Sequence, residues 1–228
     1  MSKPKWSQLI KDLRSEDTDR IVNAYQKIFE MADGSHVPEL YILLNDEDFV
    51  IREAAASPLA RLEGVKALPQ LFQAFTRGFQ DGHDNDRLTA TITDLLEEKE
   101  EEATPLLLEM LQSPDNETRA NAIWALGYTA SQIKPNVLLD LLETENNQEV
   151  RSVIIGSLSS FTGSSEVAEK LLSLLGEVHE QVRIDVISSL GFLGNKIAID
   201  PLQELLKEPI NESLREHITF ALKNLGAV

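Results

Sequence analysis

The stretch QVRIDVISSLGFLG, residues 181–194, contains the pattern that decides the fold. Its arginine is followed, after three, four and seven positions, by Val186, Ile187 and Leu190. This spacing places three apolar side chains on one face of an α-helix. A glycine, Gly194, follows where a residue in the left-handed conformation commonly ends a helix. The stretch therefore predicts an amphipathic helix that ends at this glycine.

The arginine of this stretch recurs along the whole chain at a nearly constant interval. The series is Arg20, Arg52, Arg87, Arg119, Arg151, Arg183 and Arg215. Neighbouring members are 32 residues apart, except for one interval of 35 between the second and the third. A polar residue stands four positions before each arginine: Glu16, Asp48, His83, Asp115, Asn147, His179 and Asn211. Several of these are good N-cap types, so the arginine is expected in the first turn or so of a helix.

Each repeat also contains an earlier helix. Pro38, Pro105 and Pro201 lie fourteen residues before their arginines, a place suited to a first helical turn, and apolar pairs follow them. One such helix pair cannot bury its apolar face alone, so the pairs must stack on one another. We therefore expect an all-α superhelix of about seven helix pairs in a single domain, residues 1–228. The expected repeats are 5–34, 35–66, 67–102, 103–134, 135–165, 166–197 and 198–228.

Three segments carry a resemblance to a known family. They are EVRSVIIG at 149–156, QVRIDVISSLGFLG at 181–194 and DEDFVIREAAASPLARL at 46–62. These segments resemble the short HEAT repeats of phycobilisome lyases, and the likeness extends over essentially the whole chain. The resemblance implies a HEAT-like solenoid. For function it implies little, because such repeats serve lyases, assembly factors, toxin-neutralising proteins and adaptors.

Composition narrows the classes of partner. Acidic residues outnumber basic ones by 38 to 21, and the net charge is −17. Such a field repels nucleic acid and anionic lipid, and it attracts a basic partner. The acidity also keeps an extended array soluble, so both interpretations stay open. The absence of cysteine, of a signal-peptide pattern and of a run of ~18 apolar residues predicts a cytoplasmic protein.

The seven arginines are expected to be structural. The resemblance implies that each ties helices together through acidic groups and carbonyls at helix ends. The acidic residues six positions before four of them are the expected partners: Asp46, Asp81, Glu145 and Glu177. A buried arginine requires such partners.

A binding site is expected on the concave face, which the second helices of the pairs line in solenoids of this type. Residues one, five and nine positions after each arginine form the exposed stripe beside the core. The predicted partner-binding residues on this stripe are Tyr25, Glu53, Arg61, Trp124, Tyr128, Phe192 and Phe220. Exposed Trp and Tyr favour a binding face. Packing between helices is the alternative, and it fits Phe29 and Phe220 equally well.

Two irregular segments are further candidates. The longer interval places three extra residues within 76–87, where Asp81, His83, Asp84 and Asp86 lie in a turn-rich loop. Their spacing does not match a calcium loop, so a contact with a partner is preferred to a cation site. The run EEKEEE at 97–102 is either solvated surface or an acidic knob for a basic patch, with Glu100 and Glu101 as its candidate contacts.

No catalytic motif, metal site or cofactor site is apparent, so the chain is predicted to be non-enzymatic. The leading hypothesis is a scaffold that holds a basic protein partner on its concave face. An immunity protein against a basic toxin is one form of it. The alternative, from the family resemblance, is an accessory subunit of a bilin lyase-type activity. A HEAT-type DNA glycosylase would require a basic groove, which the charge does not favour. Oligomeric state is left open.

Overall fold

The structure is a computed structural model that describes residues 5–176 and 179–227. Within these ranges the regular elements are α-helices and short 3-10 helices, without a strand. The predicted all-α class of paired helices is confirmed. None of the helices in the described ranges combines the length and the apolar character needed to cross a membrane.

The chain divides into two compact units, Met1–Glu102 and Ala103–Val228. The α-helices of the first unit are α1 (Trp6–Leu13), α2 (Thr18–Met31), α3 (Val37–Leu44), α4 (Phe49–Glu63), α5 (Leu68–Gln80) and α6 (Asp86–Glu98). Those of the second are α7 (Glu100–Met110), which begins just before the boundary, α8 (Asn116–Tyr128), α9 (Asn136–Thr144), α10 (Gln148–Leu158), α11 (Ser165–Ser173), α12 (Glu180–Leu193), α13 (Ile199–Leu205) and α14 (Glu212–Asn224). The 3-10 helices are η1 (Gly34–His36), η2 (Gly64–Ala67), η3 (Ala130–Gln132) and η4 (Lys196–Ala198). The single domain predicted from sequence stays a prediction.

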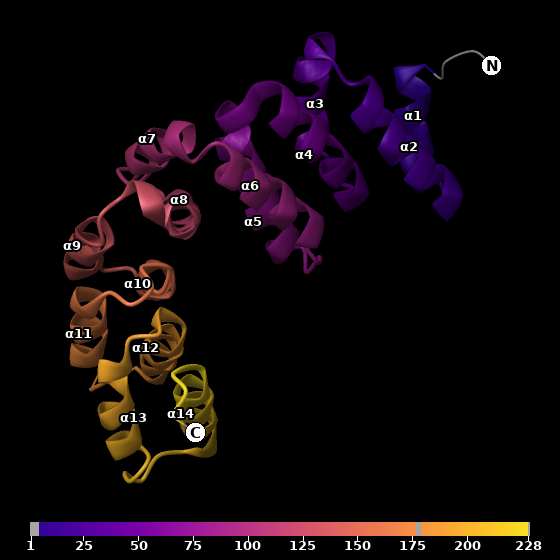
Figure 1. Cartoon of the computed structure of the whole chain (residues 1–228). Helices are drawn as coiled ribbons and strands as arrows, with labels where there is room; N and C mark the ends of the chain where they lie inside the picture. Colours follow the sequence, from indigo (N-terminus) through magenta and orange to yellow (C-terminus); the bar gives the residue numbers. More distant parts are fainter. Residues whose placement is uncertain (1–4, 177–178, 228) are drawn as a thin grey trace. The chain divides into compact units, whose positions relative to one another are not determined.

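The second unit has two layers of helices. The inner layer consists of α8, α10, α12 and α14, which contact one another in that order, and α9, α11 and α13 lie on the other side (Figure 1). The apolar residues three, four and seven positions after Arg119, Arg151 and Arg183 are all buried, as predicted. In the first unit, α2, α4 and α6 occupy the corresponding positions and contact one another in the same sequential way.

Side chains cap the inner helices at the predicted positions. The side chain of Asn147 accepts a hydrogen bond from the backbone N–H of Val150, and Asp48, Asp115 and Asn211 cap their helices in the same way. Each such cap satisfies a backbone N–H that the first helical turn leaves free. At the other end, Gly194 terminates α12 in the left-handed conformation, with φ 73°.

Two repeats depart from the predicted register. Asp17, not Glu16, caps α2, and Asn85, not His83, precedes α6. In α6 the buried residues are Leu88, Ile92, Leu95 and Leu96. Ile92 and Leu95 lie one position after Thr91 and Asp94, which the Arg87 register would bury. Leu88 and Leu96 lie one helical turn before and after Ile92, on the same face of the helix. Thr91 and Asp94 consequently lie outside the core.

The loop between α5 and α6 is anchored by a buried asparagine, which accounts for the longer repeat. Asn85 is almost fully buried, and its Nδ2 atom donates to the backbone oxygen of Phe75 at 2.9 Å. A Cβ atom at Gly78 would lie only 1.9 Å from the Oδ1 atom of Asn85. The glycine therefore provides the space into which the asparagine folds back against α5.

The acidic run lies at the junction of α6 and α7. Glu100, Glu101 and Glu102 form the first turn of α7, where negative charge interacts favourably with the helix dipole. Lys99 donates from Nζ to Glu102 at 3.1 Å. Because α7 begins at Glu100, Pro105 lies inside this helix and not in its first turn, unlike Pro38 in α3.

Candidate functional site

Three shallow hollows follow one another along the inner layer of the second unit. The first lies between α8 and α10, the second between α10 and α12, and the third between α12 and α14. Gly156 lines both the first and the second, and Ser188 lines both the second and the third. We call this continuous surface the inner groove.

Paired aromatic rings stand at both ends of the inner groove. Trp124 and Tyr128 on α8 are in edge-to-face contact, with ring centroids 5.2 Å apart. Phe192 on α12 and Phe220 on α14 form a second such pair at 5.9 Å. Phe192 is 60% exposed and Phe220 is 49% exposed. Phe220 thus contacts a ring of the neighbouring helix and keeps about half of its surface exposed, so both roles predicted for it stay open.

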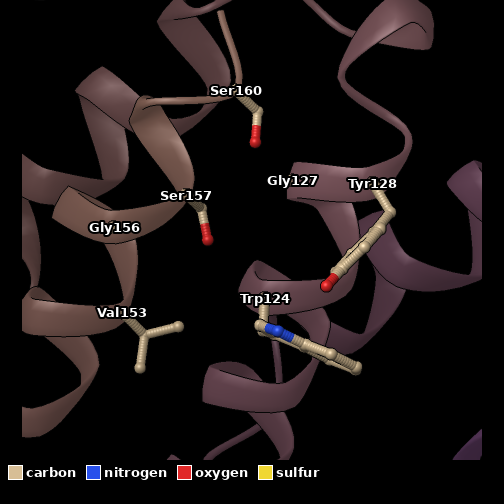
Figure 2. A pocket seen from close by; sticks show the side chains of 7 residues that line it. All are labelled: Trp124, Gly127, Tyr128, Val153, Gly156, Ser157 and Ser160. Atoms are coloured by element: carbon tan, nitrogen blue, oxygen red, sulfur yellow. The ribbon is translucent and has the colours of Figure 1, made fainter. Parts of the chain in front are cut away.

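Small residues form the floor between the aromatic pairs. Gly156, Ser160 and Ser188 occupy stripe positions five or nine residues after their arginines, the positions at which Trp124, Tyr128, Phe192 and Phe220 stand elsewhere in the second unit. The first hollow has a volume of about 460 Å³, and its floor is made by Gly156, Ser157 and Ser160 (Figure 2). The inner groove therefore has large aromatic side chains at its ends and small residues between them.

Two glycines of the groove have different physical roles. A Cβ atom at Gly127 would lie 3.2 Å from the Oγ atom of Ser160, so this glycine allows α8 and α10 to approach closely. A Cβ atom at Gly156 would meet nothing within 4 Å. Neither packing nor backbone conformation requires glycine at 156, since its φ is not positive.

Carboxylates accompany the groove along the starts of its helices. Each inner helix of the second unit has an exposed glutamate in its first turn: Glu117, Glu149, Glu180 and Glu212. The helix dipole favours negative charge at this position. Within the hollows themselves, the charged lining residues are Asp185 and Glu216, and no lysine or arginine of the described chain belongs to the lining.

The predicted stripe residues of the first unit are engaged by other parts of that unit. Tyr25 donates its hydroxyl proton to the backbone oxygen of Glu53 at 3.1 Å, and the Arg87 guanidinium lies 4.8 Å from the centre of the Tyr25 ring. Burial raises the pKa of Glu53, against the lowering effect of Arg87, and Asp84 and Asp86 raise it further.

Arg61 is also engaged within the first unit. It donates from Nη2 to the backbone oxygens of Phe29 and Ala32, at 3.0 and 2.8 Å. Its guanidinium lies 5.2 Å from the centre of the Phe29 ring. Tyr25, Glu53 and Arg61 therefore contribute to the packing of α2, α4 and α6, whereas the sequence assigned them to partner binding.

The loop residues have structural contacts as well. Asp81 forms ion pairs with Arg52 at 2.9 Å and with Arg77 at 3.6 Å, and the ring of His83 stacks on Phe49 at 4.5 Å. Asp84 accepts the backbone N–H of Asp86. No group of three metal-binding side chains occurs in the described ranges. Partner contact through Asp84, Asp86, Glu100 and Glu101 stays a prediction.

The buried arginines bridge successive repeats. Arg52 is 1% exposed, donates to the backbone oxygens of Asp46 and Glu47, and pairs with Asp81 of the next repeat. Arg119 repeats this arrangement with the oxygen of Ser113 and with Glu145, 3.0 Å away. Each carboxylate was expected to pair with the arginine of its own repeat. Arg151 instead bonds the backbone oxygen of Glu145, which leaves the Glu145 carboxylate for Arg119, and Arg87 lies over Tyr25, which leaves Asp81 for Arg52.

The pKa of Glu145 shows how strongly its contacts favour the charged form of the carboxylate. Burial alone would raise its pKa, but the backbone N–H of Asn147 and the Arg119 guanidinium outweigh burial and lower it. Arg151 and Arg215 bond backbone oxygens, those of Leu142 and Leu206. Arg183 is partly buried, and its expected partner Glu177 lies outside the described residues.

Arg20 and Arg87 do not fit the expected structural role. The Arg20 side chain is 66% exposed, and its only ion pair in the described chain, with Asp17, spans 4.0 Å. Arg87 is exposed and lies over Tyr25. Both belong to the two repeats whose register is shifted by one residue, so the position equivalent to Arg52 is taken by Ile21 and Leu88.

The sequence prediction missed the floor of the groove. It selected large side chains and passed over Gly156, Ser157, Ser160 and Ser188. The stripe rule itself contained them, because Gly156 and Ser160 are five and nine residues after Arg151. A glycine at an exposed position inside a helix is the sequence feature from which the first hollow could have been predicted.

Comparison with known proteins identifies the family. The model of HEAT repeats matches residues 78–159 and 135–223, which together extend over more than half of the chain. The chain belongs to the HEAT-repeat family, and the predicted membership is confirmed. No curated protein matches the sequence.

Several solved structures are similar at 17% sequence identity. The CpcE–CpcF complex of phycocyanin lyase from Nostoc sp. PCC7120 matches over 99% of this chain and 98% of its own, with a TM-score of 0.39. Human deoxyhypusine hydroxylase matches over 100% and 86%, with a TM-score of 0.45. A designed armadillo repeat protein in complex with the peptide (KR)4 matches over 97% and 100%, with a TM-score of 0.48.

Proposed function

We propose that the chain is a non-enzymatic scaffold that holds a basic segment of another protein in the inner groove of its second unit. The observation that carries the proposal is the pair of exposed aromatic clusters with a small-residue floor between them. Large aromatic side chains anchor protein interfaces because they bury much apolar area at low entropic cost. Phe192 and Phe220, about half exposed, have most of that area still to bury.

Charge complementarity supports a basic occupant. The chain has a net charge of −17, and exposed glutamates border the groove at the start of each inner helix. Asp185 and Glu216 lie in its lining without a lysine or arginine beside them in the described chain. A negative surface of this kind increases the association rate of a positive partner and disfavours acidic ones.

The polar groups of the groove support binding without catalysis. Ser188 and His217 line the third hollow together, but the structure has no hydrogen bond between them in the described ranges. The Nδ1 atom of His217 is instead 2.8 Å from the backbone oxygen of Ser213. A serine nucleophile would need a base within hydrogen-bond reach.

The finer predictions concern which partner is bound. An immunity protein against a basic toxin would be one instance of the proposed function. An accessory role in bilin attachment would instead place a tetrapyrrole against the aromatic rings. Both stay predictions.

The test is selection of random twelve-residue peptides displayed on phage against the immobilised full chain at 0.15 M salt. We expect enrichment of lysine and arginine, together with an apolar residue. The double variant Phe192→Ser/Phe220→Ser should keep the melting temperature and lose the enrichment, because both rings are exposed. Each hot-spot ring typically contributes more than about 1 kcal/mol. Peptides without basic enrichment, or equal enrichment on the double variant, would contradict the proposal.

A further inference from the structure

The first hollow of the inner groove is large, open and uncharged. Trp124, Gly127 and Tyr128 of α8 line one side of it, and Val153, Gly156 and Ser157 of α10 line the other, together with Ser160 just beyond the end of α10 (Figure 2). Its volume of about 460 Å³ exceeds that of any single side chain. The lining offers an indole, a phenol, an aliphatic side chain and two hydroxyls, which is a small and specific set of chemical groups.

Gly156 keeps this hollow open at a cost to its helix. A glycine inside a helix is less stable than alanine by roughly 0.5–1 kcal/mol. A Cβ at Gly127 across the hollow would lie 3.2 Å from the Oγ atom of Ser160, which is a tight contact, whereas a Cβ at Gly156 would meet nothing within 4 Å. The fold therefore gives no reason for glycine at 156. An occupant of the hollow gives this reason, because glycine at 156 leaves the space free for it.

Three hydroxyls of the hollow have no hydrogen-bond partner among the described residues. They are the Oγ atoms of Ser157 and Ser160 and the Oη atom of Tyr128. The hydroxyls of Ser157 on α10 and of Ser160 just beyond it, and the phenol of Tyr128 on α8, extend toward the space between the helices (Figure 2). Each offers lone pairs to a donor that enters from solvent.

These groups discriminate between classes of occupant. An anion would face an acidic protein and find no cationic donor in the lining. A purely apolar group would cover the hydroxyls without bonding them, which costs roughly 1–3 kcal/mol for each group left unsatisfied. A guanidinium group has five N–H donors for the hydroxyls and a flat face that stacks on an indole. The aliphatic part of an arginine side chain can pack against the apolar side chain of Val153.

We propose that the hollow between Trp124 and Gly156 is a specificity pocket for an arginine side chain of the bound partner, and that Gly156 is its specificity-determining residue. The inference rests on the proposed function, because it names the residue of the basic segment that enters the groove. Glu117 and Glu149, in the first turns of the same two helices, give a negative surrounding to the cation.

The test compares fluorescein-labelled hexa-arginine, hexa-lysine and hexa-citrulline by fluorescence anisotropy with the full chain at 0.15 M salt. Citrulline has nearly the shape of arginine without its charge, so it separates cation recognition from shape. We expect hexa-arginine to bind at least tenfold more tightly than hexa-citrulline and more tightly than hexa-lysine. Equal binding of hexa-arginine and hexa-citrulline would overturn the inference.

The decisive variant is Gly156→Leu, which places a branched side chain in the hollow without a change of charge. We expect it to weaken hexa-arginine binding at least tenfold. The matched control is Gly34→Leu, where a Cβ also meets nothing within 4 Å but the residue lies in the first unit. This control should bind as the unmodified protein does. Tyr128→Phe, which removes one acceptor and leaves the hollow open, should weaken binding about threefold and covers the case in which the leucine variant misfolds.

Unchanged hexa-arginine binding by Gly156→Leu would place the arginine elsewhere and overturn the inference. The proposed function would survive that result, because it is tested separately through Phe192 and Phe220. Conversely, loss of peptide selection in the phage experiment together with a functioning Gly156 pocket would show that the hollow binds arginine outside a protein-binding groove.

Discussion

The inner layers of the two units use the same repeat positions in opposite ways. In the first unit, Tyr25 bonds the backbone of α4, and Arg61 bonds the end of α2. In the second unit, the stripe residues Tyr128, Phe192 and Phe220 are 39–60% exposed and are in edge-to-face contact with neighbouring rings. A stripe residue that completes its own fold is not available to a partner, so the second unit is the better candidate for binding.

The packing around Tyr25 follows from a one-residue shift of register in α2 and α6, whereas α4, which carries Arg61, keeps the predicted register. In the first and third repeats the arginine is displaced from the position equivalent to Arg52, where the half-buried Ile21 and the buried Leu88 stand. Arg87 is thereby placed on the exposed side of α6, where it lies over Tyr25. The same residue type in the same sequence pattern thus becomes part of the core in one repeat and part of the surface in another.

The largest expected effect separates these two kinds of arginine. Arg52→Ala should lower the free energy of unfolding by about 3 kcal/mol, because it removes a buried charge that bonds two carbonyls and pairs with Asp81. Arg20→Ala is the matched control and should change it by less than about 0.5 kcal/mol, since its side chain is exposed. Urea unfolding measures both. Equal losses would contradict the register assignment.

A second substitution tests the close packing of the inner layer in the second unit. A Cβ at Gly191 would lie 2.8 Å from the Cα of Ala221, so Gly191→Ala forces α12 and α14 apart. We expect a loss of about 2 kcal/mol from overpacking. An unfolding free energy equal to that of the unmodified chain would show that these two helices are not in the described contact.

A pair of tyrosine substitutions compares the two inner layers directly. Tyr25→Phe should cost about 1 kcal/mol of stability, because the hydroxyl bonds the Glu53 backbone, whereas Tyr128→Phe should cost close to nothing. Thermal unfolding followed by circular dichroism gives both values. If the order were reversed, the hydroxyl of Tyr128 would be the structural one and the groove would lose a candidate contact.

The smallest expected effect has the opposite sign. Gly156→Ala should raise the free energy of unfolding by roughly 0.5–1 kcal/mol, because alanine favours the helix and its methyl group meets nothing. The same urea titration measures it. A destabilised variant would mean that the helix needs glycine at 156, and the case for an open binding hollow would fail.

The sequence predicted the helices and the core well, because these depend on local periodicity. The apolar residues after Arg119, Arg151 and Arg183 repeat at helical spacing, and the caps at Asp48, Asp115, Asn147 and Asn211 act through neighbouring N–H groups. The pairing of Asp81 with Arg52 and of Glu145 with Arg119 was not predictable in this way. It depends on which repeat lies within reach, and spacing within one repeat does not contain that information.

The candidate site was predictable only in part. The stripe rule found Trp124, Tyr128, Phe192 and Phe220, since large aromatic residues are conspicuous at polar positions. It also selected Tyr25, because a shift of one residue leaves the sequence pattern almost unchanged, and Arg61, whose bonds to the end of α2 depend on the neighbouring repeat. The floor at Gly156 was missed because a small residue has meaning only when the space above it is known.

The most direct measurement uses the two tryptophans, one of which lies in each unit. Trp124 lines the inner groove, and Trp6 lies in α1 against His36. Trp6→Phe leaves Trp124 as the sole emitter, and Trp124→Phe leaves Trp6. Titration with a selected basic peptide should shift the emission of the first protein and leave that of the second unchanged. A shift confined to Trp6 would place the partner on the first unit and contradict the account.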